Sequence, residues 1–156
     1  MRMNTRQPIA EFLYQIEHQD SPLLLATMHS AYAILNPNQP DPIVGCCILI
    51  PKLIVPSPNE LSHQERARFF LDMTILGDAI MMATGSLRIN YLTLCNQAPE
   101  LHGHCIPRFD SEDPIRRKKC PFTAYDFAQS RASEPHGRDE TLVSRLKLAL
   151  QSRLSE

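Results

Sequence analysis

The stretch "LRINYLTLCNQAPELHGHCIPR", residues 87 to 108, decides the fold because it places two strand-like segments on either side of a turn. Residues 87–94 and 100–106 are rich in apolar residues, whereas the intervening "CNQAP" is typical of a turn. Because only about five residues separate the two segments, we expect them to pair as an antiparallel hairpin.

Polar side chains occupy every second position of the second segment. Side chains at alternate positions of a strand share one face and lie about 6.5 to 7 Å apart. Glu100, His102 and His104 therefore share one face, and we expect that face to meet a ligand or solvent. The opposite face carries small or apolar residues that can pack against a core, namely Leu101, Gly103 and Cys105.

Three interpretations of this polar face follow from the residues alone. The side chains are surface groups of an antiparallel strand, or they are metal ligands, or His102 is a nucleophile. A metal would need a fourth ligand from His63, His136 or an aspartate elsewhere. A nucleophilic role has a chemical basis because neutral imidazole attacks phosphorus near pH 7 without activation by a base.

The rest of the chain predicts an α+β fold with an antiparallel sheet. Apolar residues at helical spacing predict helices over about 7–18, 62–84 and 139–154. The middle helix is bounded by a Ser62 and Glu65 capping box and by Gly85. Short apolar runs predict strands over 23–27, 31–35 and 43–50, and "NPNQPDP" (36–42) predicts a loop.

Composition indicates one domain, 1–156, with a small-molecule partner. Of the 156 residues 43% are hydrophobic and 21% charged, and the net charge of -1 argues against nucleic-acid and membrane-surface partners. Five cysteines without a Cys-x-x-Cys pair favour a reducing compartment. The first 16 residues lack the apolar core of a signal peptide, so we expect a cytoplasmic location.

"RINYLTLCNQAPELHGHCIPRF" resembles the signature of the histidine triad superfamily of nucleotide hydrolases and transferases. It is similar to the bacterial branch that reads Gly-Asn-Gln-x-Pro-His-Leu-His-x-His and ends in Ile-Pro-Arg. Upstream, "AYAILNPNQPDPIVGCCILIPK", a proline-containing loop and a long helix follow that family's order. The resemblance covers about 12–110 and leaves an extension, 111–156, unplaced. It implies a sheet of about five antiparallel strands with the long helix packed on it, a homodimer, and an enzyme without an obligatory cofactor; the site residues expected on this basis include no metal ligand.

The resemblance also implies roles for individual residues. His102 would attack the α-phosphate of a nucleotide and form a covalent nucleotidyl-imidazole, with its Nδ1 proton held by a backbone carbonyl. His104 would donate a hydrogen bond to a phosphate oxygen. Asn96 corresponds to a family asparagine near the phosphate, and Asn36 to a residue that holds the ribose. The other expected substrate contacts are Gln97 and Glu100.

Glu100 departs from the family pattern, which has histidine at this position. At about 7 Å its charge would stabilise a protonated His102 by about 2.4 kcal/mol at an effective dielectric of about 20, and by about 0.6 kcal/mol in water. The larger value would leave His102 unable to attack. The alternative function is therefore a catalytically impaired nucleotide- or phosphate-binding module, with a metal-binding protein as the third hypothesis.

Two further features allow two interpretations each. Arg108 follows the motif and could reach a phosphate or form a salt bridge at the end of the strand. The C-terminal helix carries a leucine stripe that could serve a dimer interface or fold back on its own domain, made of Leu142, Leu146, Leu150 and Leu154.

Overall fold

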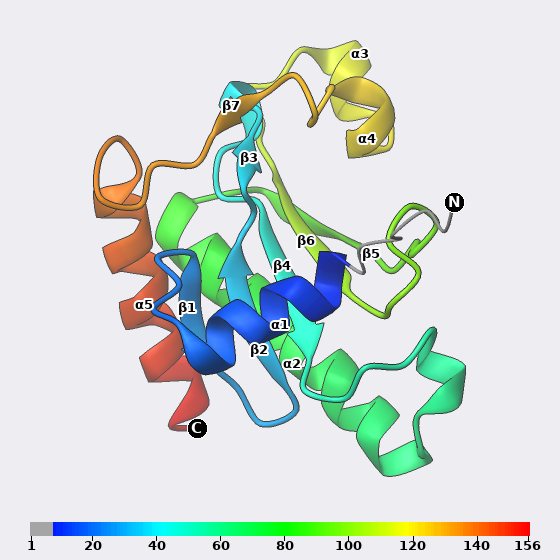
Figure 1. Cartoon of the computed structure of the whole chain (residues 1–156). Coiled ribbons are helices and arrows are strands. Elements are labelled where there is room, and N and C mark those ends of the chain that lie inside the picture. The colour runs from blue at the N-terminus through cyan, green and yellow to red at the C-terminus, as the bar shows by residue number, and fades with distance from the viewer. Residues whose placement is uncertain (1–7) are drawn as a thin grey trace, which may run out of the picture.

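A five-stranded antiparallel sheet forms the centre of the computed structural model, which describes residues 8–156 (Figure 1). The strand order is β1-β2-β4-β6-β5, and every neighbouring pair is antiparallel. This confirms the predicted α+β class with five strands. The strands are β1 (Leu24–Thr27), β2 (Ala31–Leu35), β4 (Cys47–Pro51), β5 (Arg88–Leu92) and β6 (Gly103–Arg108).

Helices cover both faces of the sheet. In Figure 1, α1 (Pro8–His18) lies in front of the sheet, whereas α2 (His63–Thr84) and α5 (Glu140–Leu154) lie behind it. All three helices were predicted, although residue 7, the expected start of the first, lies outside the described residues. The Ser62 and Glu65 capping box and the left-handed Gly85, with φ 68°, confirm the predicted ends of α2. None of the helices described is long and apolar enough to span a bilayer.

The leucine stripe of α5 folds back on its own domain. Leu146 and Leu150 are fully buried in the cluster that joins α5 to α2 and the sheet, whereas Leu154 at the end of the helix is 40% exposed. Burial of two leucine side chains contributes about 3 to 6 kcal/mol to the stability of this layer. The extension therefore supplies part of the core.

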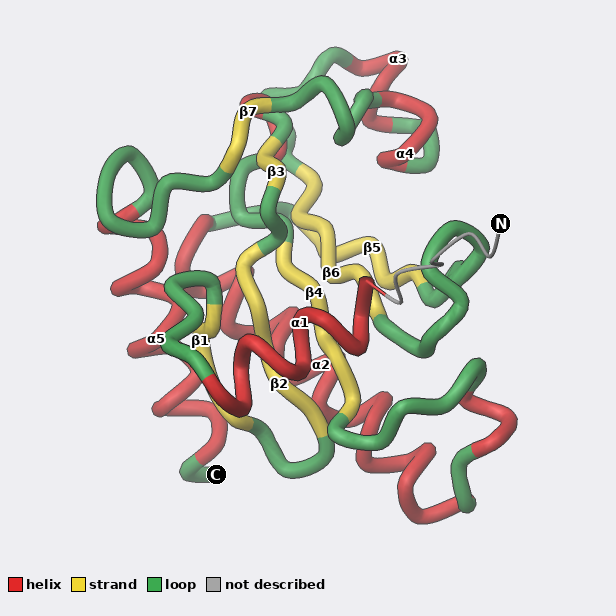
Figure 2. The backbone as a smooth tube through the Cα atoms, in the orientation of Figure 1, coloured by secondary structure: helices red, strands yellow, loops and turns green. Residues whose placement is uncertain are grey.

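Short elements lie at the end of the sheet where β6 ends (Figure 2). They are the small sheet of β3 (Asn38–Gln39) and β7 (Arg131–Ala132), the 3-10 helix η1 (Asp41–Ile43), and the single turns α3 (Pro114–Arg117) and α4 (Pro121–Ala124). A second 3-10 helix, η2 (Pro58–Glu60), lies elsewhere, just before α2. The expectation that 36–42 is entirely loop was therefore wrong.

The predicted start of the third strand was also wrong, because the strand begins at Cys47 instead of 43. Residues 41–43 form η1, and Gly45 has a φ of 113°, which breaks the extended run. The buried Gln39 amide replaces the sheet ladder there. Its oxygen accepts the N–H groups of Gly45 and Cys46, and its nitrogen donates to the carbonyls of Asn36 and Cys46.

The predicted hairpin is confirmed, with register from Arg88↔Arg108 to Leu92↔His104. Its second strand starts at Gly103 and not at 100, because the N–H of Leu101 donates to the carbonyl of Val55 at 2.7 Å and so draws this segment toward the chain after β4. The strand then continues through Pro107. A proline is tolerated there because β4 pairs only with residues 103–105.

Gly103 fits a position where no larger side chain has room. Leu101 and Cys105 lie in the core against α2, as predicted, and a Cβ at Gly103 would lie 2.8 Å from the sulfur of Met73. We expect Gly103→Ala to lower the free energy of unfolding by about 1–3 kcal/mol through overpacking, measured by urea denaturation. Gly137→Ala in an exposed loop is the control. Equal stability of the two variants would contradict the tight packing at Gly103.

Candidate active site

A cleft of about 630 Å³ lies between the β5–β6 loop and the chain that follows β6. Both segments lie on the same side of the molecule in Figure 2. The cleft brings together four of the predicted site residues, Asn96, Gln97, His102 and His104. Its other lining residues are Leu94, Cys95, Ala98, Phe122, Thr123, Tyr125, Asp126, Phe127 and Ala128.

His102 is held in one orientation and one tautomer. Its side chain is buried, and its Nδ1 lies 2.8 Å from the backbone carbonyl of Glu100. A carbonyl oxygen can only accept, so Nδ1 carries the proton in this hydrogen bond. In the neutral ring, Nε2 then bears the free lone pair. The backbone contact is the one that the nucleophile hypothesis requires.

His104 stands beside His102 in a largely apolar environment. Its ring centre lies 5.0 Å from that of His102 and 4.9 Å from that of Phe122, both in edge-on arrangements. Burial and the neighbouring His102 lower the pKa of His104 to about 4. His104 is therefore neutral at pH 7 and offers one N–H as a donor.

The lowered pKa of His104 makes the stability depend on pH. Between pH 6.5 and about 4 the unfolded chain binds a proton that the folded His104 does not, so the free energy of unfolding falls as the pH falls. From pH 7 to pH 5 we expect a loss of about 2 kcal/mol. Urea denaturation at both pH values measures this loss of unfolding free energy. We expect the His104→Gln variant to lack the contribution that His104 makes to it. An unchanged difference in the variant would refute the assignment.

Glu100 and Asn36 are not among the residues that line the cleft. The Glu100 side chain is only 5% exposed, and neither carboxylate oxygen has a hydrogen-bond partner within residues 8–156. Its backbone carbonyl, not its carboxylate, contacts His102. Asn36 is buried beside β3, where its Oδ1 accepts the N–H of Asn38 at 3.1 Å.

Sequence reasoning did not identify Cys95 as a site residue. Its backbone is left-handed, with φ 52°, and its Sγ lies 3.8 Å from Nδ1 of His102. The side chain is half-buried and lines the cleft. No pattern in the neighbouring residues indicates a φ above zero at a cysteine, so the contact could be found only from the fold.

An aromatic wall from the extension was also missed. Phe122, Tyr125 and Phe127 line the cleft opposite the β5–β6 loop, in a region that the family resemblance left unplaced. The signal in the sequence was "PFTAYDF" (121–127), three aromatic residues within six positions. Without the fold, nothing connects this run to the histidines.

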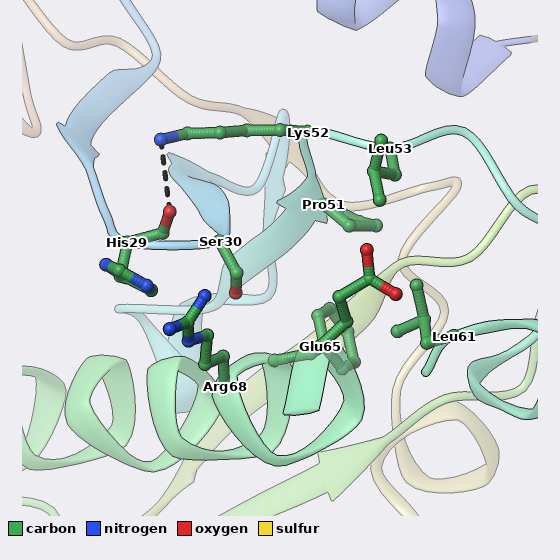
Figure 3. Close-up of a pocket in the computed structure, with 9 residues that line it drawn as sticks. His29, Ser30, Pro51, Lys52, Leu53, Leu61, Glu65 and Arg68 are labelled. Atoms are coloured by element: carbon green, nitrogen blue, oxygen red, sulfur yellow. Dashed lines mark hydrogen bonds between the residues drawn. The ribbon is translucent and has the colours of Figure 1, made fainter. Parts of the chain in front are cut away.

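A second hollow, of about 200 Å³, lies between the β1–β2 turn, the end of β4 and the start of α2 (Figure 3). Two of its charged side chains already serve the local structure. Lys52 donates to the carbonyl of His29 at 3.2 Å, and Glu65 belongs to the capping box of α2. The histidine cleft is larger and brings together groups suited to catalysis, so it is the candidate active site.

Residues 8–156 contain no set of side chains that would support the metal hypothesis. Within this range no group of three histidine, cysteine, aspartate or glutamate side chains is placed to hold an ion. The sequence pattern of alternate positions does not produce a metal site here because the Glu100 carboxylate is buried away from the cleft.

The sequence matches no protein-family model and no curated protein. The structure, by contrast, is similar to solved structures. A histidine triad protein from Sinorhizobium meliloti 1021 has 19% identity and a TM-score of 0.66, covering 81% of this chain and 88% of that one. A hypothetical histidine triad nucleotide-binding protein from Sulfolobus tokodaii strain7 has 17% identity and a TM-score of 0.68, covering 91% and 92%.

A zinc-bound histidine triad family protein from Mycobacterium smegmatis is similar over 91% of this chain and 93% of that one, with 14% identity and a TM-score of 0.65. These structures share the sheet and the long packed helix described above while differing in most residues. The chain therefore has the α+β fold of the histidine triad proteins.

Proposed function

We propose that this chain is a nucleotide phosphohydrolase or nucleotidyltransferase that acts through a covalent nucleotidyl intermediate on His102. The observation that carries the proposal is the 2.8 Å contact between Nδ1 of His102 and the carbonyl of Glu100, which leaves Nε2 as a nucleophile in the cleft. The fold shared with histidine triad proteins supports it.

In the first step, the Nε2 lone pair of His102 attacks the α-phosphorus. A bond from Nε2 to phosphorus forms while the bond from phosphorus to the leaving group breaks, and the leaving group departs with its electron pair and takes a proton from water. In the second step, water attacks the phosphorus, the bond to Nε2 breaks, and the nucleoside monophosphate is released with a proton passing to solvent. The proton stays on Nδ1, hydrogen-bonded to the Glu100 carbonyl, throughout both steps.

Neutral donors line the cleft in the described part of the chain. Asn96, Gln97 and His104 can donate to phosphate oxygens, whereas the lining contains an aspartate, Asp126, and neither lysine nor arginine. A substrate with several additional negative charges would meet Asp126 without a compensating cation from these residues. We therefore propose a nucleoside phosphoramidate, or a similar substrate of low charge, over a dinucleoside polyphosphate.

The alternative function is a nucleotide- or phosphate-binding module without turnover. It is favoured by Glu100, which stands where the family pattern has histidine and whose carboxylate is buried without a partner within residues 8–156. In that case the cleft would hold a nucleotide, while attack by His102 would be too slow to matter.

Assembly and location complete the proposal. We propose a homodimer, because β5 is an outer strand of the sheet with a free edge, and two exposed apolar residues accompany it, Leu87 just before the strand and Tyr91 within it, 54% and 43% exposed. The five cysteines are all free thiols, which suits a reducing cytoplasm. The expected partner is a small nucleotide, with no cofactor, nucleic acid or membrane.

Release of AMP from adenosine phosphoramidate and from a dinucleoside polyphosphate, measured from pH 6 to 9, tests the proposal. We expect turnover with the phosphoramidate and a lower kcat/KM with the polyphosphate. Nucleotide binding without release of AMP from either substrate would favour the binding module instead.

A further inference from the structure

Arg108 is the centre of a buried hydrogen-bond network at the end of β6. Its side chain is only 3% exposed and all its N–H groups have acceptors. It forms an ion pair with the fully buried Glu112 at 2.9 Å, and it also donates to Asn90 and to the carbonyls of Arg116 and Lys119. Of the two roles considered for Arg108, the structure shows the salt bridge.

The network continues from Glu112 to Tyr125, which lines the cleft. The Tyr125 hydroxyl donates to Glu112 Oε1 at 2.8 Å. The ring itself is buried in a cluster with Ile106, a β6 residue two positions beyond His104. Tyr125 therefore joins β6, which carries His104, to the extension that forms the opposite wall.

The segment fixed by Tyr125, residues 121–128, packs directly on the candidate site. Phe122 contacts His104 edge-on at 4.9 Å between ring centres, and Phe127 supports Phe122 at 4.8 Å. The ring of Phe122 therefore covers one side of His104 within the cleft. Phe122 lies three residues before Tyr125, whose hydroxyl is bound to Glu112.

We infer that Tyr125 is a positioning residue of the histidine cleft: its hydroxyl, bound to the buried Arg108 and Glu112 pair, holds segment 121–128 against His104. Without the hydroxyl the segment separates from the network, Phe122 leaves His104, and water enters the cleft. The structural part of this inference stands by itself, and only its effect on turnover rests on the proposed function.

Four groups in the cleft can influence the charge of His104. His102 and Cys95 lie on the chain between β5 and β6, and Tyr125 and Asp126 lie on segment 121–128. Burial is the largest cause of the low pKa of His104, followed by His102. Opening of the segment would therefore raise the pKa of His104 toward the 6.5 of an exposed histidine.

An NMR titration of the histidine ring carbons in Tyr125→Phe tests the inference. In the wild type we expect His104 to titrate at a pKa of about 4, and in the variant closer to 6.5. The matched control is Tyr14→Phe, because Tyr14 is 53% exposed on α1 and only stacks on His18 at 4.4 Å. This control should leave the titration of His104 unchanged.

Kinetics provide the second readout. In Tyr125→Phe we expect the KM for adenosine phosphoramidate to rise about tenfold, because segment 121–128 no longer forms one wall of the cleft, with a kcat close to that of the wild type, because His102 keeps its contact with the Glu100 carbonyl. A folded Tyr125→Phe protein with an unchanged His104 titration would overturn the inference. Absence of turnover in the wild type would count against the proposed function alone, since the titration needs no activity.

A second variant keeps the test decisive if Tyr125→Phe does not fold. Phe122→Leu removes the aromatic contact on His104 and leaves the Arg108, Glu112 and Tyr125 network intact. We expect the pKa of His104 to rise in this variant too. An unchanged titration in Phe122→Leu would show that segment 121–128 does not shield His104 and would overturn the inference.

Discussion

Replacing His102 with asparagine is expected to lower the release of AMP from adenosine phosphoramidate by about 10⁴-fold or more. Asparagine can still donate to the Glu100 carbonyl, but it has no nitrogen lone pair to attack phosphorus. Initial rates of AMP release under saturating substrate measure the effect, and retained nucleotide binding shows that the cleft has survived the substitution.

His18→Asn is the matched control for this prediction. The Nδ1 of His18 also lies close to a backbone carbonyl, that of Tyr14 at 3.1 Å, but His18 is exposed on α1. We expect its turnover to equal that of the wild type. Turnover by His102→Asn within a factor of ten of the wild type would mean that another group performs the chemistry.

Arg108→Met is expected to lower the free energy of unfolding by about 3–5 kcal/mol. The substitution leaves the fully buried Glu112 carboxylate without its cation and removes hydrogen bonds to Asn90, Arg116 and Lys119. Urea denaturation measures the change. Arg138→Met is the control, because the Arg138 and Asp41 side chains are both 57% exposed and such pairs contribute about 1 kcal/mol or less.

The same network predicts that the free energy of unfolding falls at acid pH. Burial would raise the pKa of Glu112, but hydrogen bonds from Arg108, Phe109 and Tyr125 outweigh it and hold this pKa below its usual value. The folded carboxylate therefore binds a proton less readily than the unfolded one, so its stabilising effect is present above the unfolded pKa of 4.5 and lost as the pH falls below it. Arg108→Met should lose this dependence. If Arg108→Met retained this pH dependence, Arg108 would not be the main partner of the Glu112 carboxylate.

Local patterns predicted those parts of the fold that depend on neighbours in the sequence. The capping box at Ser62, the glycine at the end of α2 and the β5–β6 hairpin all follow from residues a few positions apart. The beginnings of β4 and β6 could not be predicted. They depend on the Gln39 side chain, which binds the N–H groups of Gly45 and Cys46 six and seven positions away, and on the carbonyl of Val55, which accepts the N–H of the distant Leu101.

Part of the candidate site could likewise be predicted from the sequence, and part depends on the fold. The alternation of His102 and His104 and their resemblance to a family motif led from the sequence to the chemistry proposed above. The environment of these histidines was not predictable, because Phe122 and Tyr125 come from the extension that the sequence resemblance left unplaced, and Tyr125 is tied to a buried ion pair. The carboxylate of Glu100 shows the same limit, since its burial depends on packing between distant segments.

Trapping of the covalent adduct tests the central claim most directly. Wild-type protein is mixed with adenosine phosphoramidate and quenched in denaturing alkali, because a phosphorus bond to imidazole is labile in acid. Trypsin should release residues 89–108 as one peptide that contains both His102 and His104. The proposed mechanism predicts an adenylyl group on His102, located by fragmentation of that peptide. An adenylyl group on His104, or steady turnover with neither histidine modified, would contradict it.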